Sequence, residues 1–547
     1  MSQHNHTPQP HPAINGGDLR TRCLLLSLLA AMSVLSPSEA KAQTENGNGM
    51  PKLVVNILVD QLRSDYLEAF MPLYGEDGFK RLMREGRIYS QTDYPSSHTD
   101  IASAAATVAT GSAPSRHGII SSQWLDRKTL RPTFCVDDAT YEGTGTTTDK
   151  SSPANLSTST VSDELKMATD GQALVYAIAP MREAAILSGG HAADAAIWID
   201  DQNGGWCSSS YYGSLPAWVD MCNTGSAMSS KLKGLTWMPS SEQVGTFSYF
   251  LTGGAKEPFT HKFKGDDRYT DFKTSGLVNV EVANTAIACL ENTPIGADNI
   301  TDLLAVTFYA GSYEHRPASI APMEIQDTYV RLDKALADLI SAVGRKIGVQ
   351  NALFVLTSTG YTDEENHDFR KFRIPTGTFD MRRASALLNM YLVAVYGHGN
   401  FVEACYGTHF YLNHRLIEEK QLNLANVLDR TQDFLLQLSG VKDVYTSNRL
   451  MLGAWTSGLN RIRAGYNPRC SGDVMVEVMP GWRHVNEDTR EDRLVRDSYI
   501  PYPIIFFGHT IQGEKIETPV TVDRIAPTLS KAMRIRAPNA CGVAPLF

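Results

Sequence analysis

Several absences narrow what this 547-residue chain can be. It contains no Cys-x-x-Cys pair, which argues against a zinc site built from thiolates. It has no basic run, and a formal net charge of −9 argues against nucleic acid or an anionic membrane as a partner. There is no internal repeat or low-complexity tract. What remains is globular composition, 42% hydrophobic and 20% charged, enough for one large core or a few domains.

Beyond residue 42 the chain has no apolar run of about 18 residues, so we expect a mature protein without a transmembrane segment. Residues 23–35 form a shorter apolar run, preceded by Arg20 and Arg22 and followed by the small-x-small site at residues 40–42. This pattern predicts a secretory signal peptide over residues 1–42, cleaved near Ala42. The protein is therefore expected in the periplasm or outside the cell.

An odd number of cysteines remains once residues 1–42 are removed, so at least one thiol has no intramolecular partner. In an oxidising compartment Cys207 and Cys222 could close a local loop. The sequence does not fix the connectivity of the full set: Cys135, Cys207, Cys222, Cys289, Cys405, Cys470 and Cys541.

The stretch 51–67, PKLVVNILVDQLRSDYL, organises the rest of the chain. Residues 53–59 are all Leu, Ile or Val except Asn56, which predicts a strand buried in a parallel sheet. The strand ends at Asp60, on the edge where ligands of α/β sheets bind. Asp60 is therefore either a metal ligand or the cap of the following helix.

The segment 94–118 is the most unusual in the chain. It begins with turn residues, continues as a helix of small residues from about Ile101 to Thr110, and turns again at Gly111 and Pro114. Alanine, serine and threonine allow such a helix to pack closely on a sheet. Several candidate N-cap residues stand at its start, between Ser97 and Asp100, and a helix N-terminus suits an anion.

Strands and helices alternate through the rest of the chain, which predicts a three-layer α/β/α fold with a mostly parallel central sheet. Residues 200–270 and 380–480 are richer in turns and aromatics, and we interpret them as insertions capping the carboxyl edge of the sheet. The predicted strands are residues 174–178, 184–187, 302–308 and 352–356, and the predicted helices are residues 155–168 and 323–343.

Many of these stretches resemble the alkaline phosphatase superfamily, and within it the periplasmic PafA-type phosphatases of Bacteroidetes. The resemblance covers residues 50–547 and implies one alkaline-phosphatase-like domain with the two insertions. It also implies a pair of zinc ions about 4 Å apart that clamp a phosphoryl group. Six Asp and His ligands, a Thr or Ser nucleophile, and Asn, Lys and Arg contacts to phosphate belong to that site. The matching stretches include VVNILVDQLRSDYL, TGSAPSRHGII, QWLDR, FCVDD, NLSTSTVSDELKMATDG, AAILSGGHAADAAIWID, DTYVRLDKALADLI, YLNHRLIEEKQLNL, GVKDVYT and VDRIAPTLS.

The metal ligands of the family carry over unevenly. The first aspartate lands on Asp60. Of the other ligand positions only one keeps a ligand residue, His315. The remaining positions are Gly311, then Thr359 and Gly360 for an Asp-His pair, and a place near Pro501 for the last histidine.

The nucleophile and the phosphate contacts are also altered. Counting without gaps places the nucleophile at Ile101, and a slip of one or two residues makes it Asp100 or Thr99. The phosphate-binding asparagine lands near Ser122. The Lys-x-Arg pair lands on Met181 and Glu183, and a one-residue slip would keep its arginine as Arg182.

Two ligands, Asp60 and His315, remain of six, and the family assigns them to different metals. Because zinc needs three or four ligands, we predict that no zinc is held. A relocated single-metal site from Asp60, His98, Asp100 and His315 is the alternative. We favour the interpretation that His98 and Asp100 cap the helix and that the stretch DEENHD, residues 363–368, is a solvated loop.

Three hypotheses follow. The first is a secreted, PafA-like pseudoenzyme without a cofactor, whose cleft or insertions bind a ligand or protein partner in the cell envelope. The second is a zinc-dependent hydrolase of phosphate mono- or diesters with a rearranged site. The third is a structural component of a periplasmic or surface assembly that uses insertions such as residues 203–222.

Overall fold

The computed structural model describes residues 49–225, 228–244, 258–316, 319–361, 369–453, 456–495 and 500–547. The predicted signal peptide therefore lies outside the described residues. No helix in the described ranges is both long enough and apolar enough to pass through a membrane. All seven cysteines after residue 42 are free thiols, including Cys207 and Cys222.

The central sheet has eleven strands, and its middle strands run parallel. β1 (Leu53–Asp60) lies between β11 (Asp302–Tyr309) and β12 (Ala352–Ser358) and is parallel to both. All eight residues of β1 are buried, as the apolar run predicts. The remaining strands are β6 (Val175–Ala179) and β7 (Ala195–Ile199), which continue the parallel part, and β8 (Trp206–Ser209), β5 (Gly143–Thr144), β20 (Tyr502–Gly508), β2 (Arg87–Asp93), β21 (Glu514–Ile516) and β22 (Val520–Thr521).

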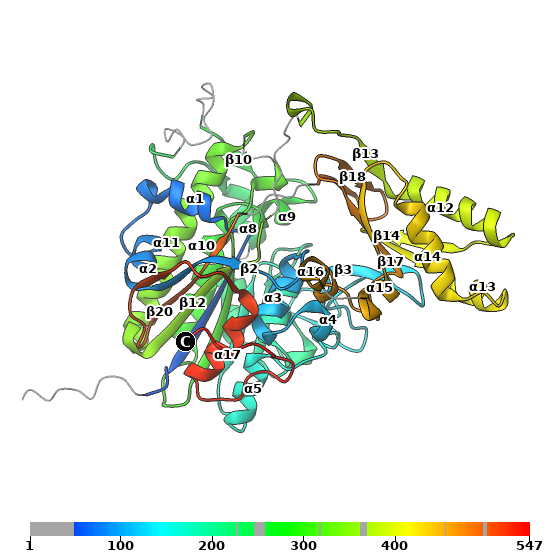
Figure 1. Cartoon of the computed structure of the whole chain (residues 1–547). Coiled ribbons are helices and arrows are strands. Elements are labelled where there is room, and N and C mark those ends of the chain that lie inside the picture. Colours follow the sequence, from blue (N-terminus) through cyan, green and yellow to red (C-terminus); the bar gives the residue numbers. More distant parts are fainter. Residues whose placement is uncertain are drawn as a thin grey trace, which may run out of the picture. The chain divides into compact units, whose positions relative to one another are not determined.

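Helices cover both faces of this sheet, which confirms the predicted three-layer α/β/α architecture (Figure 1). Side chains alternate along β1, so that Val55 and Ile57 enter one core layer and Val54 and Leu58 enter the other. The first layer is covered by α1 (Ser64–Ala69), α2 (Phe79–Glu85), α10 (Leu277–Asn292) and α11 (Pro322–Ile347). The second is covered by α3 (Ile101–Thr110), α5 (Val161–Ala168), α6 (Arg182–Gly189) and α17 (Ile525–Ala532).

The helix of small residues has the predicted bounds, Ile101–Thr110. Asp100 caps it and forms a capping box with Ser103. Its end at Gly111 requires glycine, because the backbone there has φ +63° and a Cβ would meet the carbonyl oxygen of Asp523 at 3.0 Å. Nine of its ten residues are buried, so the small side chains bring the helix close to the sheet and to α6.

Two predicted elements are wrong in type or length. Residues 184–187 form part of α6 rather than a strand, because a short apolar run does not by itself distinguish a buried helix from a strand. The helix expected from residue 155 begins at Val161, where Thr160 and Asp163 form a capping box.

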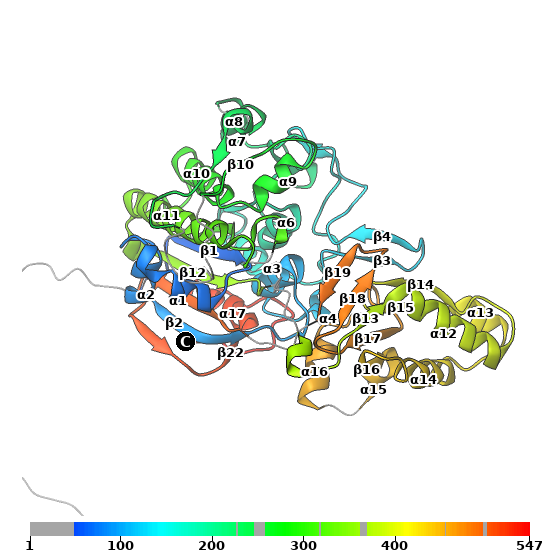
Figure 2. The ribbon, with the colours of Figure 1, turned by 90° about the horizontal axis from the view of Figure 1, so that it is seen from above.

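Residues 378–494 build their own sheets and a separate hydrophobic core, centred on Met381, Leu388, Phe410 and Val476. Their helices and strands are β13 (Thr378–Asp380), α12 (Met381–Tyr396), β14 (Val402–Tyr406), β15 (His409–Leu412), α13 (His414–Glu419), α14 (Leu424–Leu435), β16 (Val441–Thr446), α15 (Ser447–Leu452), α16 (Ser457–Ala464), β17 (Val474–Val478), β18 (Arg483–Asn486) and β19 (Glu491–Leu494). Figure 2 shows this insertion beside the hairpin of β3 (Gln123–Asp126) and β4 (Arg131–Phe134).

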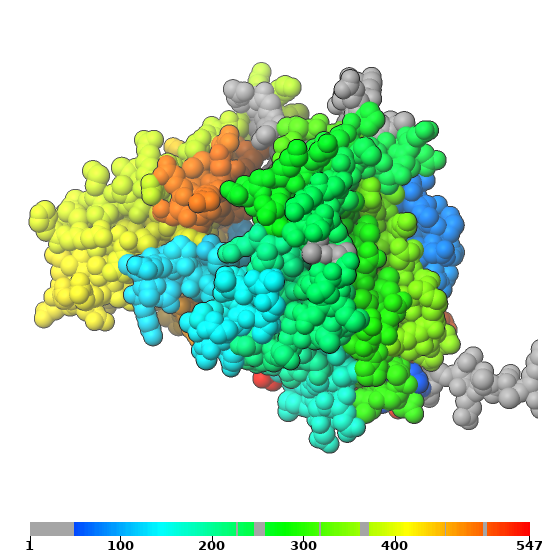
Figure 3. Space-filling model, turned by 180° about the vertical axis from the view of Figure 1, so that it is seen from behind, coloured from blue at the N-terminus to red at the C-terminus, as the bar shows by residue number. Residues whose placement is uncertain are grey.

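Polar contacts join that hairpin to the insertion. Arg127 binds the Asp473 carboxylate and the Ser471 carbonyl, and the Tyr406 hydroxyl donates to Gln123 at 2.5 Å. In the space-filling view the cyan region of the hairpin lies against the yellow and orange insertion (Figure 3). Of residues 200–270, which were expected as the smaller insertion, residues 206–209 belong to the central sheet as β8. The other described strands and α-helices of this range are α7 (Ala217–Gly225), α8 (Met228–Gly234), β9 (Thr236–Trp237), β10 (His261–Lys262) and part of α9 (Arg268–Lys273).

Candidate functional site

Asp60 stands at the carboxyl end of β1 with its side chain buried. The Thr359 hydroxyl, just beyond the neighbouring strand β12, donates a hydrogen bond of 2.6 Å to its Oδ1 atom. The same hydroxyl accepts from the backbone N–H of Gln61, whose φ of +64° is unusual for a residue other than glycine. Asp60 does not cap the next helix, because Arg63 is the N-cap of α1 and no side chain bonds there. The cap interpretation of Asp60 is therefore wrong.

Negative charge accumulates around Asp60. The pKa of Asp60 is raised to about 6, first by burial and then by the nearby carboxylates of Glu183 and Asp100, while the Thr359 hydrogen bond partly offsets these effects. Burial also raises the pKa of Glu183, and the negative charge of Asp100 adds to this effect. The carboxyl edge of β1 thus gathers three acidic side chains, and the charge of Asp100 contributes to the raised pKa values of both Asp60 and Glu183.

Thr99 and Asp100, the alternatives for the nucleophile, occupy different positions. The Thr99 hydroxyl lies 3.4 Å from where a Cβ on Gly360 would stand, so it faces the residue that follows Thr359. Asp100 is committed to its helix, because one carboxylate oxygen accepts from the N–H and hydroxyl of Ser103. Its other oxygen accepts from the N–H of Ser122 at 2.5 Å. The prediction that Asp100 caps the helix is confirmed, whereas the prediction for His98 is wrong, because the capping box consists of Asp100 and Ser103.

Arg182, the candidate phosphate contact, is engaged elsewhere. Its guanidinium donates to Asp137 at 2.9 Å and to Ser151 at 3.1 Å, and it lies over the ring of Phe134. Its neighbour Glu183 is the residue that interacts electrostatically with Asp60.

His315 ends the turn that follows β11, with φ +53° and an exposed side chain. No hydrogen bond or ion pair joins it to Asp60 in the described ranges. Nor do any three His, Cys, Asp or Glu side chains among the described residues form a group that could hold a metal ion. The donors present there do not fit a zinc ion, which needs three or four ligands. The acidic stretch from Asp363 to His367 lies outside the described residues.

A cleft of about 330 Å³ opens beside the start of α3. Ser97, His98 and Ser122 line it from the sheet domain, and His409 and Arg493 line it from the insertion. The pKa values of His98 and His409 are each lowered to about 4, mainly because desolvation by the surrounding protein disfavours the charged imidazolium. The side chain of His98 is nevertheless exposed to solvent where it lines the cleft. Both imidazoles are therefore neutral at pH 7.

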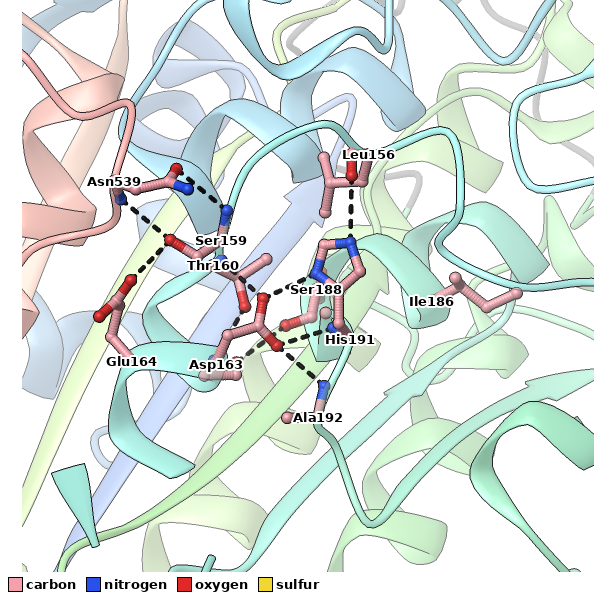
Figure 4. A network of polar contacts seen from close by, with 12 residues as sticks. Leu156, Ser159, Thr160, Asp163, Glu164, Ile186, Ser188, His191, Ala192 and Asn539 are labelled. Atoms are coloured by element: carbon pink, nitrogen blue, oxygen red, sulfur yellow. Dashed lines mark hydrogen bonds and ion pairs between the residues drawn. The ribbon is translucent and has the colours of Figure 1, made fainter. Parts of the chain in front are cut away.

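His191 takes part in a polar network at the end of α6 (Figure 4). Its Nδ1 atom lies 2.8 Å from the Asp163 carboxylate and its Nε2 atom 3.0 Å from the carbonyl oxygen of Leu156. Both partners are acceptors, so the geometry fits an imidazolium that donates twice. The pKa of His191 is accordingly raised, chiefly by its hydrogen bond to Asp163. His117 is buried, bonds to the Thr107 hydroxyl and accepts from the N–H of Ile119, so its imidazole has a structural role.

The class of the protein is indicated by its three-layer α/β/α fold around a mostly parallel sheet, by the acidic carboxyl edge of that sheet and by the large insertion. Residues 54–499 match the family described as type I phosphodiesterase/nucleotide pyrophosphatase, and the chain belongs to that family, within the alkaline phosphatase superfamily.

Two characterised relatives are similar over nearly their whole length. Alkaline phosphatase PafA of Elizabethkingia meningoseptica is 28% identical over 95% of this chain and 98% of its own. Alkaline phosphatase PhoV of Synechococcus elongatus is 29% identical over 94% of this chain and 97% of its own. The crystal structure of wild-type PafA superposes with a TM-score of 0.79 at 27% identity, covering 92% of this chain and 99% of the other. The resemblance to PafA-type phosphatases is thereby confirmed for the fold.

Two features of the site were missed in the sequence. One is the hydrogen bond from Thr359 to Asp60, although the parallel pairing of their strands would have placed the two residues side by side. The other is the electrostatic contact of Glu183 with Asp60. Adjacent helical residues project about 100° apart, so the engagement of Arg182 away from the site and the proximity of Glu183 to it are linked.

Proposed function

We propose that this protein is a catalytically inactive member of the alkaline phosphatase superfamily that binds a ligand or a protein partner in the cell envelope. The observation that supports this most is the hydrogen bond between Thr359 and Asp60. Thr359 stands at the position where the family resemblance implies a second metal-binding carboxylate, and its hydroxyl donates to the Asp60 carboxylate. The neutral Thr359 hydroxyl brings no negative charge that would attract a metal dication. The hydrogen bond between Thr359 and Asp60 satisfies both side chains without a metal ion.

The electrostatics of the site also oppose phosphate. A phosphoryl group is held by cations and directed N–H groups that neutralise its charge. Here Asp60, Asp100 and Glu183 contribute negative charge, and Arg182 is paired with Asp137. A dianionic substrate would meet repulsion where the family resemblance implies an arginine.

The location and the partner belong to the same proposal. The predicted signal peptide supports a periplasmic or secreted protein, with either the cleft or the insertions as the binding surface. Pull-down from envelope extracts would separate these roles. A partner lost on substituting cleft residues indicates ligand-like binding, whereas a partner lost on substituting an exposed residue of the smaller insertion, such as Met221→Ser, indicates a scaffold.

The direct test is hydrolysis of p-nitrophenyl phosphate and bis-p-nitrophenyl phosphate by the purified mature protein, with and without added zinc. We expect no turnover above that of a buffer control. Turnover that disappears in both Asp60→Ala and Thr99→Ala would overturn the proposal, because a contaminating phosphatase would be insensitive to these substitutions.

A hydrolase with a rearranged site is the second candidate, and one observation favours it. Thr99 places a hydroxyl next to Gly360, on the same edge as Asp60, so a nucleophile is present at the expected level of the sheet. Such an enzyme would need further metal ligands, which the described residues do not supply. In that case Thr99→Ser would retain activity and Thr99→Ala would lose it.

A further inference from the structure

The cleft beside α3 combines apolar walls with a pair of opposite charges. Buried side chains of Trp124, Tyr406, Tyr411 and Met475 form part of its wall. Its volume of about 330 Å³ lies at the lower end of the range for small-molecule pockets. The cleft therefore suits a compact ligand with an apolar part.

The charges come from one strand, β19. Glu491 and Arg493 both line the cleft, and as residues two apart on a strand they point to the same face. No ion pair joins them in the described part of the chain. The Arg493 guanidinium has no hydrogen-bond or ion-pair partner among the described residues, and the Glu491 carboxylate receives one hydrogen bond, from Thr489 to its Oε2 atom. Within the described part of the chain, the Glu491 Oε1 atom and the Arg493 guanidinium are thus uncommitted.

The other polar groups of the cleft do not neutralise this pair. Asp100 uses both carboxylate oxygens on Ser103 and Ser122. His98 and His409 have pKa values lowered to about 4 and are neutral at pH 7. His484, buried behind Glu491 with its Nδ1 atom 3.9 Å from that carboxylate, has a lowered pKa as well.

We propose that the cleft binds a small zwitterion, an α-amino acid or dipeptide with an apolar side chain, whose ammonium group binds Glu491 and whose carboxylate binds Arg493. A guanidinium holds a carboxylate through two parallel hydrogen bonds, and a carboxylate accepts well from an ammonium. A ligand with only one charge would leave the other protein charge without a partner. The inference rests on the proposed binding role of the cleft but does not depend on whether hydrolysis is lost.

The test uses the full mature protein, L-phenylalanine and L-alanyl-L-phenylalanine as probes, and titration calorimetry. Two single-charge analogues, 3-phenylpropanoate and 2-phenylethylamine, serve as matched controls on the unmodified protein. At least one zwitterion should bind, and each analogue should bind at least about tenfold more weakly, because it lacks a charge-assisted hydrogen bond.

The variants Arg493→Gln and Glu491→Gln should each weaken zwitterion binding by a similar factor, about tenfold or more. Arg490→Gln, in the same hairpin but outside the cleft lining, should bind as the unmodified protein does. The inference is overturned if neither zwitterion binds, if the analogues bind equally well, or if Arg490→Gln matches Arg493→Gln. If a variant does not fold, the comparison of zwitterions with single-charge analogues on the unmodified protein still tests the inference. Zinc content and turnover, measured separately, report on the proposed loss of catalysis and not on this site.

Discussion

At the scale of single residues, the buried carboxylate of Asp60 accepts a hydrogen bond from the Thr359 hydroxyl and interacts electrostatically with Glu183 and Asp100. Its pKa of about 6 in the folded protein lies above the value of 3.8 for an unperturbed aspartate. The folded state therefore binds this proton more tightly than the unfolded state does. Ionising Asp60 costs stability, and that cost develops as the pH rises from about 4 to about 6.

Asp60→Asn should consequently stabilise the protein at about pH 7.5, because it removes an unfavourable buried charge while its amide oxygen can still accept from Thr359. The expected gain is about 1–3 kcal/mol in the free energy of unfolding, and it should vanish near pH 4. Chemical denaturation at the two pH values measures it. Exposed Asp77→Asn is the control and should change stability by less than about 0.5 kcal/mol. If Asp60 held a metal ion, the substitution would destabilise the protein instead.

The identity of the residues at the site was largely accessible from the sequence, but their orientation was not. Asp60, Thr359 and Gly360 lie at the ends of strongly apolar strands, so their positions could be predicted from the run lengths. Whether Arg182 or Glu183 approaches Asp60 depends on the rotation of α6, which is set by packing of its apolar side against the sheet. A one-residue uncertainty in register on a helix changes which side chain faces the site.

At the scale of elements, the start of α3 lies beside Asp60 and the cleft, and Asp100 caps its first turn. Replacing Asp100 by alanine removes the bonds to Ser103 and to the Ser122 N–H. We expect a loss of about 1–2 kcal/mol in the free energy of unfolding. Asp100→Asn can keep the capping bond from the Ser103 N–H through its single amide oxygen but cannot also accept from the Ser122 N–H, so it should lose less than Asp100→Ala. Equal losses in urea denaturation would argue that the charge of Asp100 or its bond with Ser122, and not the cap on Ser103, is what matters.

The second element-scale prediction concerns the loop and helices joined by Asp163 and His191. The pKa of His191 is raised in the folded protein, so its stabilising effect is complete below the unfolded value of 6.5 and is lost as pH rises through the folded value. His191→Gln should therefore lower the melting temperature most near about pH 5.5, and the difference from the unmodified protein should shrink toward about pH 9.

Thermal unfolding of both proteins across this range gives the measurement, with the exposed His398→Gln as control. A difference that stays constant with pH would show that His191 acts only through neutral hydrogen bonds. The sequence could not reveal this network, since Leu156, Asp163 and His191 come together only through the turn that precedes α5 and the end of α6.

At the scale of the whole molecule, the three-layer fold was predictable because the strands of its central sheet are continuous apolar runs separated by amphipathic helices. The cleft was not, because its walls come from residues such as Trp124 and Arg493, more than 300 positions apart in the sequence. Long-range contacts between the β3–β4 hairpin and the insertion, such as Arg127 with Asp473, bring them together. We propose that the protein keeps the layers and the capping insertion of the phosphatase fold while the chemistry at the edge of the sheet has changed.

The central claim is that this edge holds no catalytic metal, and the metal content of the protein tests it most directly. The mature protein is purified without chelators, dialysed against zinc, desalted and measured by inductively coupled plasma mass spectrometry. We expect far less than one zinc ion per chain, because the described donors cannot supply three or four ligands at one point. Two tightly held zinc ions per chain would contradict the account.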